Sequence, residues 1–195
     1  MYYYPNVADD VYTPIYFLPG DNLFSPSEDF EELTARKALF DAVCRRITDC
    51  MPDGLSMYDS YRYFSLVIAQ MCSYDNSQRT VSLPYPAYNA LVNGSAVCSG
   101  YACAMQHLCR MAGLWCVRID GTKDGGAHAW NTIWLDDYYY SDPTATAAMD
   151  PLSAYWYEAF VIPNETAQSE KYLPYKSVYE LADSLPVSLT SLLPE

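Results

Sequence analysis

The residues with the greatest chemical reactivity lie in two stretches of the sequence, and the first of these contains Cys98. This cysteine follows a Gly-Ser-Ala-Val segment and comes directly before apolar residues that recur at helical spacing. A helix that begins here directs its free N–H groups and partial positive charge at the thiol, which lowers a thiol pKa and favours the thiolate. The backbone N–H of Cys98 is also suited to stabilise an oxyanion. We therefore predict that Cys98 is a nucleophile.

The second stretch supplies a base and a carboxylate for that nucleophile. His128 opens a segment of β-branched and aromatic residues, and Asp142 lies in the next such segment. A hairpin that turns at Asp136 and Asp137 pairs residue 128 with residue 144 or 145, so Asp142 becomes a near-diagonal neighbour of His128. A thiolate, a base and a group that orients the base are what covalent acyl transfer requires. The sequence thus predicts a Cys-His-Asp triad.

Helices are expected before and after Cys98. Residues 25–52 begin with Ser, Pro and acidic side chains, which favour a helix N-terminus, and end at a Pro-Asp-Gly sequence. A second helix is expected over about 56–71, a short one over 87–94 closed by Gly94, and one from Cys98 to Gly113. The positions expected to face inward in the long helices are Phe30, Leu33, Phe40, Val43, Ile47, Tyr61, Phe64, Val67, Ile68, Met71, Tyr101, Ala102, Met105, Leu108, Cys109 and Ala112.

After Gly113 the sequence pattern changes from helix to strand. Residues 114–120, 127–135 and 138–144 are β-branched and aromatic and are separated by turn residues, so they predict consecutive antiparallel strands. Residues 155–163 suggest another strand, and residues 164–173 a short helix. The expected fold is α+β, with N-terminal helices and a central Cys-bearing helix packed on an antiparallel sheet.

Composition excludes several classes of function. The chain of 195 residues is long enough for one domain with a sizeable core. Its net charge of −13 argues against binding nucleic acid, which requires a basic surface. No apolar run is long enough to span a bilayer, and residues 1–20 lack the features of a signal peptide. The compartment stays open, with an exported or cell-surface protein whose leader is absent from this chain as the favoured expectation.

The motifs around the three candidate residues resemble those of a known family. The sequences GSAVCSGYACAMQHLCRMAGL (94–114) and GGAHAWNTIWLDDYYYSDPT (125–144) are similar to the transglutaminase-like superfamily, in its bacterial branch, which has the papain-like cysteine fold. This resemblance implies that Cys98 is the nucleophile, His128 the general base and acid, and Asp142 the residue that orients the histidine. It extends from about residue 25 to 175. We accordingly predict an extension over 1–24 and a transglutaminase-like domain over 25–195, with core motifs at 94–146.

The sequence departs from the family pattern at two places near these motifs. Many members have glycine in the turn that is Asp136-Asp137 here, and the tryptophan that often follows Asp-x-Thr is Ala145. Neither change touches the three candidate residues, although the second alters the edge of the expected cleft. Trp130 and Trp134 lie on the same strand face as His128. Trp130 either lines the substrate cleft or fills the core, and Trp134 is expected to fill the core. Tyr74 is a weaker cleft candidate, for which packing at the surface is the alternative.

The remaining cysteines and the other histidine predict no further site. His107 is nine residues from Cys98, or about 13 Å along a helix, so we expect a structural role. Cys103 and His107 share a helix face, but Cys109 does not project the same way, and zinc needs at least three ligands. We expect Cys103, Cys109 and Cys116 to be packing residues, or disulfide partners if the chain is exported. No metal and no cofactor is predicted.

The most specific function that the sequence predicts is thiol-dependent acyl transfer, with Cys98 attacking an amide or peptide carbonyl. Release of the acyl group to water makes the protein a cysteine protease or amidase, which is the favoured reading. Release to an amine makes it a protein-glutamine transglutaminase, because both reactions share the first half-reaction. A non-catalytic binding module on the same fold is the third possibility. The expected partner is a peptide or protein substrate, including a cell-wall-associated one.

Overall fold

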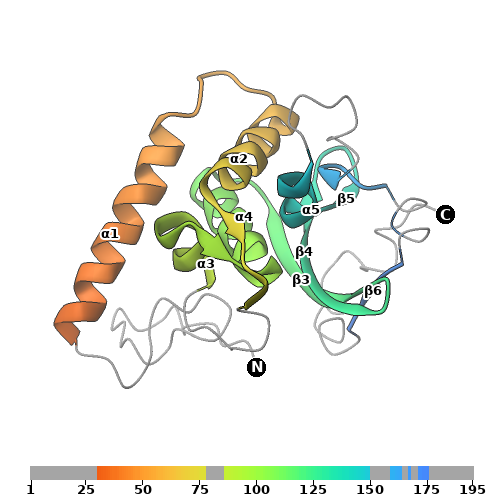
Figure 1. Cartoon of the computed structure of the whole chain (residues 1–195). Coiled ribbons are helices and arrows are strands. Elements are labelled where there is room, and N and C mark those ends of the chain that lie inside the picture. Colours follow the sequence, from red (N-terminus) through yellow and green to blue (C-terminus); the bar gives the residue numbers. More distant parts are fainter. Residues whose placement is uncertain (1–29, 78–85, 150–158, 164–166, 168–170, 176–195) are drawn as a thin grey trace, which may run out of the picture.

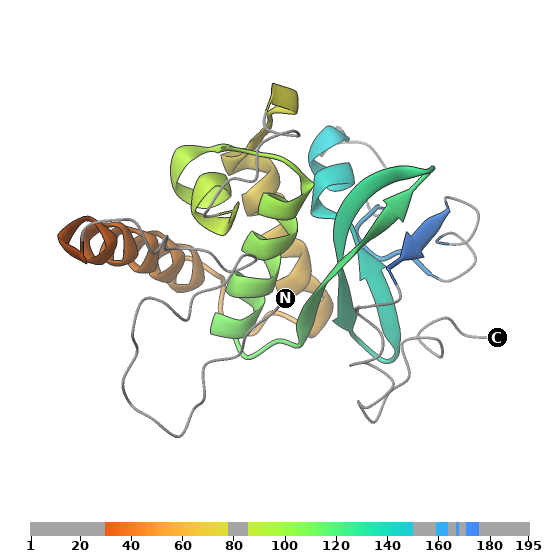
Figure 2. The same cartoon turned by 90° about the horizontal axis from the view of Figure 1, so that it is seen from below.

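Helices form one side of the molecule and a curled antiparallel sheet forms the other (Figures 1 and 2). The computed structural model describes residues 30–77, 86–149, 159–163, 167 and 171–175. The helices are α1 (Phe30–Asp49), α2 (Met57–Met71), α3 (Pro86–Tyr88), the π-helical η3 (Asn89–Asn93), α4 (Cys98–Met111) and α5 (Pro143–Ala148). The strands are β1 (Ser73–Tyr74), β2 (Ser95–Ala96), β3 (Cys116–Lys123), β4 (Gly126–Trp134), β5 (Tyr138–Ser141) and β6 (Tyr172–Pro174).

The helices begin and end close to the predicted residues. The Ser56 side chain accepts a hydrogen bond from the Asp59 N–H and caps α2. Gly94 ends η3 with a φ of 69°, a backbone conformation that favours glycine. Gly113, just beyond α4, has a φ of 73°. These signals are local in the sequence, and for that reason the predicted ends of α2, η3 and α4 are confirmed within a few residues. The predicted start of the first helix, near residue 25, lies outside the described residues.

The main sheet has the strand order β5-β4-β3-β6, and every neighbouring pair is antiparallel. In the β4–β5 hairpin Asn131 pairs with Ser141 and Trp134 pairs with Tyr138, which is the register predicted from a turn at residues 136–137. A separate two-stranded sheet is parallel and places Tyr74 beside Ala96. The expected α+β fold, with the Cys-bearing helix packed on an antiparallel sheet, is confirmed.

Two hydrophobic clusters lie on opposite faces of the sheet. The larger one encloses α4 between the sheet and the other helices, and Asn131 of β4 donates a hydrogen bond from Nδ2 to the Ala102 carbonyl of α4 at 3.0 Å. Most of the predicted inward positions are buried there, including Phe40, Ile47, Tyr61, Phe64, Ile68, Tyr101, Met105 and Leu108. The smaller cluster covers the other face and contains Ile119, Trp130, Tyr140, Ile162, Ala167 and Tyr172.

Several predictions for the second half of the chain are wrong or fall outside the described residues. The segment 138–144, predicted as a strand, is a strand only to Ser141, and Asp142 caps the helix α5. Ile162 forms only an isolated bridge to Tyr140, and Tyr172 and Leu173 form a strand where a helix was predicted. Residues 1–29, 150–158, 164–166, 168–170 and 176–195 lie outside the described part, and with them the predicted boundary at residue 25 and most of the predicted 155–163 strand and 164–173 helix.

Among the residues that the structure describes, no helix combines the length and the apolar character needed to cross a bilayer.

Gly121 of β3 provides a test of how closely the sheet is packed. A Cβ at this position would lie 2.4 Å from the Leu173 carbonyl oxygen, 2.6 Å from Trp130 Cη2 and 2.7 Å from Pro174 Cα. We expect Gly121→Ala to lower the free energy of unfolding by about 1–3 kcal/mol, because the added methyl group forces the strands and the indole apart. Urea unfolding followed by tryptophan fluorescence measures this change.

Gly126 in the same hairpin is the matched control. A Cβ there meets nothing nearer than the Lys123 carbonyl oxygen at 3.6 Å, an ordinary contact. Gly126→Ala should therefore change stability by no more than about 0.5 kcal/mol. Equal effects of the two substitutions would contradict the packing described for Gly121.

Candidate active site

Cys98 is the first residue of α4, directly after the short strand β2 and the N-cap residue Val97. Its side chain is half-buried, within the turn whose N–H groups have no partner inside the helix. The same turn requires glycine at position 100, because a Cβ there would lie 2.4 Å from Ala96 Cβ and 2.9 Å from the Pro86 carbonyl oxygen. The Ser-Gly step after Cys98 thus allows α3 and β2 to pack closely against the start of α4.

His128 is the third residue of β4, and its side chain is 14% exposed. Its Nε2 lies 2.7 Å from Oδ2 of Asp142, and the imidazole also makes a hydrogen bond with the Cys98 thiol. Since Nε2 faces the carboxylate, Nδ1 is left for the sulfur. The ring lies nearly parallel to the indole of Trp130, with the ring centroids 6.0 Å apart. The structure therefore holds the imidazole between a thiol and a carboxylate.

Asp142 is wholly buried and lies between the end of β5 and the first turn of α5. Its Oδ1 accepts hydrogen bonds from the backbone N–H groups of Thr144 at 3.1 Å and Ala145 at 3.0 Å. Its Oδ2 accepts from His128 and, at 2.8 Å, from the hydroxyl of Tyr172. Four donors thus surround this carboxylate, which is what a buried charge needs in order to be stable.

The pKa values of the three groups shift in mutually dependent directions. Burial alone would raise the pKa of Cys98, but the hydrogen bond and charge of His128, with backbone N–H groups of Ala129 and Ser99, lower it below its ordinary 9.0. Burial would lower the pKa of His128, yet hydrogen bonds to Asp142 and Cys98 and their charges raise it to about 9. These directions favour a thiolate and an imidazolium side by side.

The pKa of Asp142, the third group, is also shifted by its neighbours. Burial would raise it, but the hydrogen bond and charge of His128, the Ala145 N–H and the Tyr172 hydroxyl hold it below its ordinary value of 3.8.

The pKa values of the other cysteines with a resolved shift are changed in the opposite direction to that of Cys98. Burial raises the pKa of Cys44 to about 12 and raises those of Cys72 and Cys109 as well. Among these four thiols, only Cys98 has a pKa that is lowered, which is the direction that favours a thiolate.

The two residues predicted to line a cleft occupy different places. Trp130 has no exposed surface and lies in the smaller core cluster, with its indole stacked on the imidazole of His128. It therefore packs in the core and does not line an open cleft. Tyr74 is half-buried on β1, beside Ala96, with its ring stacked on that of Tyr101 at 6.2 Å. Trp134, expected to fill the core, is 37% exposed and packs against Tyr138. A role of Tyr74 at a cleft stays a prediction.

His107 and the remaining cysteines show ordinary packing. The His107 ring lies 4.7 Å from that of Phe40, between α4 and α1, in the structural position that was expected. The thiol of Cys103 accepts a hydrogen bond from Arg118 at 3.1 Å. All seven cysteines are free thiols, and no group of three metal-binding side chains occurs among the described residues.

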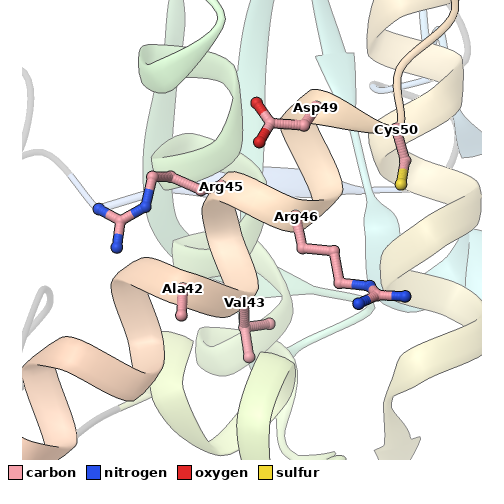
Figure 3. Close-up of a pocket in the computed structure, with 6 residues that line it drawn as sticks. All are labelled: Ala42, Val43, Arg45, Arg46, Asp49 and Cys50. Atoms are coloured by element: carbon pink, nitrogen blue, oxygen red, sulfur yellow. The ribbon is translucent and has the colours of Figure 1, made fainter.

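A pocket elsewhere on the molecule does not belong to this site. It is open to solvent, has a volume of about 630 Å³ and lies along the last turns of α1 (Figure 3). None of its lining residues belongs to an element that carries Cys98, His128 or Asp142. The residues that line it are Ala42, Val43, Arg45, Arg46, Asp49 and Cys50.

Two features of the site were not predicted from the sequence. The Asp-Pro-Thr sequence carries a helix-start signal, since aspartate favours the N-cap and proline the first helical position, but the aromatic pattern before it predicts a strand through residue 144. Tyr172 and its neighbour Lys123, whose Nζ donates to the Tyr172 hydroxyl at 2.7 Å, have no local signal at all. Tyr172 comes to Asp142 only because β6 pairs with β3.

A family model and a solved structure are similar to parts of this chain. No curated protein matches the sequence. A crystal structure of a TGase is similar at 17% identity and a TM-score of 0.48, over 69% of this chain and 38% of that one. The chain thus spans well under half the length of that protein. Residues 41–143, more than half of the 195, match the model of the transglutaminase-like superfamily. The chain therefore belongs to the transglutaminase-like superfamily.

Proposed function

We propose that this protein is a cysteine-dependent acyl-transfer enzyme whose catalytic residues are Cys98, His128 and Asp142, and that it hydrolyses an amide or peptide bond. The observation that supports this most strongly is the continuous contact from thiol to imidazole to carboxylate. The superfamily typically performs acyl transfer through a cysteine, so the proposal agrees with the family. Its expected substrate is a peptide or protein, a cell-wall-associated one included.

In the proposed reaction the Cys98 thiolate attacks the carbonyl carbon, and the carbonyl oxygen takes the negative charge. His128, as imidazolium, then protonates the leaving amine, so that the C–N bond breaks and a thioester remains on the sulfur. Water attacks the thioester while His128 accepts a proton from it, and the thiol and a carboxylic acid are released. Asp142 holds the imidazole in position and stabilises its charged form throughout.

The first turn of α4 is placed to support the charge that develops in this reaction. The N–H group of Ser99 in this turn and the N–H group of Ala129 in β4 interact with the sulfur, and both lower the pKa of the thiol. The N–H of Cys98 lies in the same turn, where no helical carbonyl accepts it. We propose this N–H as a donor to the oxyanion of the tetrahedral intermediate.

Hydrolysis is favoured over amine transfer because water needs no binding site of its own. A cross-linking enzyme must hold two substrates, a glutamine donor and an amine acceptor, next to one thioester. The two reactions therefore differ in the group that accepts the acyl group, which is water in one and an amine in the other. The test must compare turnover with and without the amine.

The reactivity of Cys98 is the first expected consequence. An ordinary thiol with a pKa of 9.0 is almost entirely protonated at pH 6, whereas a thiolate held by imidazolium reacts there. We expect iodoacetamide at pH 6 to alkylate Cys98 selectively, and His128→Ala to slow this by on the order of 100-fold. Mass spectrometry of the digested protein gives the rate for each cysteine.

Cys50 is the necessary control, because it is exposed while the other five cysteines besides Cys98 are buried. In a Cys50→Ser background any fast alkylation must come from Cys98. A slow rate at pH 6 that does not change in His128→Ala would mean that Cys98 is an ordinary thiol, and the proposed enzyme would be wrong.

Two substitutions of Asp142 separate the effect of its charge on His128 from its effect as the cap of α5. Asp142→Asn keeps an oxygen for the Thr144 and Ala145 N–H groups but removes the charge, so the pKa of His128 should fall from about 9 toward 6.5. Asp142→Ala should produce the same fall and also lose about 1 kcal/mol of stability with the cap. Proton NMR of the two histidines measures the first effect and urea unfolding the second.

Either of two results would count against these roles. A His128 pKa that stays near 9 in Asp142→Asn would show that the carboxylate charge does not hold the imidazolium. Equal stability of the Asn and Ala variants would show that the Asp142 side chain does not support α5.

The reaction type is tested with a library of glutamine-containing peptides, with and without a labelled primary amine. We expect ammonia release or peptide cleavage that depends on Cys98 and does not slow when the amine is omitted. The Cys98→Ser variant is the control for contaminating activity. Incorporation of the label that requires Cys98 would replace hydrolysis by cross-linking, and no turnover with a reactive Cys98 would favour a binding module.

A further inference from the structure

Asp142 has one more hydrogen-bond donor than a helix cap and a triad require. The cap uses Oδ1, and the imidazole uses Oδ2. Tyr172 donates a further hydrogen bond to Oδ2 at 2.8 Å, from a side chain that is only 4% exposed. The oxygen that orients His128 is therefore shared between two donors.

Because Tyr172 shares Asp142 Oδ2 with His128, the carboxylate attracts the imidazolium proton less strongly. A carboxylate oxygen that already accepts a hydroxyl proton attracts a second proton less strongly, since part of its charge is neutralised. The hydroxyl also directs the positive end of its dipole at the site where the imidazolium N–H lies. Tyr172 thus opposes the effect of Asp142 on His128, while it helps to keep Asp142 ionised.

Lys123 strengthens this opposition. Its Nζ donates a hydrogen bond to the Tyr172 oxygen at 2.7 Å and lies 4.4 Å from the centre of the tyrosine ring. A hydroxyl that accepts a bond from an ammonium group is a stronger donor in turn, because hydrogen bonds in a chain polarise one another. The ammonium charge also lies behind the hydroxyl, where it disfavours a second positive charge on His128.

The fold brings Tyr172 to this place through a short edge strand. Residues Tyr172–Pro174 of β6 pair with Gly121–Lys123 of β3, so Lys123 lies directly opposite Tyr172. The tyrosine ring packs against Trp130 at 5.1 Å and His128 at 6.3 Å, while Leu173 on the other face is 60% exposed. The buried side chain of β6 is thus the one whose hydroxyl reaches the carboxylate.

We propose that Tyr172, supported by Lys123, is a positioning residue of the active site: it shares Asp142 Oδ2 with His128 and limits how firmly the carboxylate holds the imidazolium proton. This inference rests on the proposed function, in which His128 must give that proton to the leaving amine. A general acid is most effective when its pKa lies near the working pH. With Asp142 and Cys98 both raising the pKa of His128, a counteracting group keeps the proton transferable.

The charged groups around His128 come from each element packed against it. Cys98 of α4 and Asp142 before α5 both favour the imidazolium. Tyr172 of β6 and, through it, Lys123 of β3 oppose it. The residue of β3 directly opposite His128 is Gly121, which carries no charge.

The test is an NMR titration of isotope-labelled histidine in the full chain. The protein has two histidines, so the His128 signal is resolved against His107, which packs on Phe40 and serves as an internal control. We expect Tyr172→Phe to raise the His128 pKa by about half a unit to one unit and to leave His107 unchanged. Lys123→Met should raise the His128 pKa by a smaller amount, and Lys123→Arg, which keeps the positive charge, should leave the His128 pKa at its original value.

Matched variants separate this role from simple packing. Tyr172→Phe keeps the ring contacts with Trp130 and His128, and thermal unfolding checks that the fold is retained. Tyr175→Phe removes a hydroxyl from the exposed end of the same segment and should not move the His128 titration. An unchanged or lowered His128 pKa in Tyr172→Phe would overturn the proposal, and an unchanged one in Lys123→Met would overturn the part assigned to Lys123.

Failure of this inference is distinguishable from failure of the proposed function. The proposed function fails if Cys98 of the unmodified protein is unreactive at pH 6. The inference fails if Cys98 is reactive but the hydroxyl of Tyr172 leaves the His128 pKa where it was. The two readouts come from different residues and different variants.

Discussion

The fold around the candidate site depends on the burial of a single carboxylate. Asp142 has no exposed surface, and a charge in that position is stable only when hydrogen-bond donors replace the water it has lost. Its donors come from α5, β4 and β6, of which β6 lies well beyond the other two in the sequence. Satisfying this charge therefore favours a β5 that ends before Asp142, an α5 that begins directly after it, and a β6 paired with β3.

The same carboxylate links stability to reactivity. One oxygen caps a helix and the other orients the imidazole, so the position of Asp142 is held by backbone before any substrate arrives. Close backbone approach has a similar effect at two glycines. Gly100 lets β2 and α3 pack against the first turn of α4, and Gly121 lets β6 approach β3 and Trp130. A site supported from several directions is held in one geometry, which efficient acyl transfer requires.

The sequence predicted what local signals and periodicity determine. Helix starts and ends, the order of β3 to β5 and the register of the β4–β5 hairpin follow from capping residues, alternation and one turn, and that register brings Asp142 to His128. The contact of Tyr172 with Asp142 was not predictable, because it depends on β6 pairing with β3 across a long stretch of chain. The exposure of Trp134 was not predictable from the sequence, because the alternation of residues along a strand shows which face a side chain is on but not whether other elements cover that face.

In the proposed active site the charges alternate in sign from one group to the next. The proposed thiolate at Cys98 and imidazolium at His128, with the carboxylate of Asp142 and the ammonium of Lys123 behind the Tyr172 hydroxyl, sum to zero. Without Lys123 the same groups would carry one net negative charge in a chain whose formal charge is already −13. Surplus negative charge disfavours a thiolate by repulsion and favours protonation of the site. Lys123 thus makes this proposed group of charges neutral as a whole, so that a thiolate at Cys98 depends on its own neighbours and little on the acidic surface.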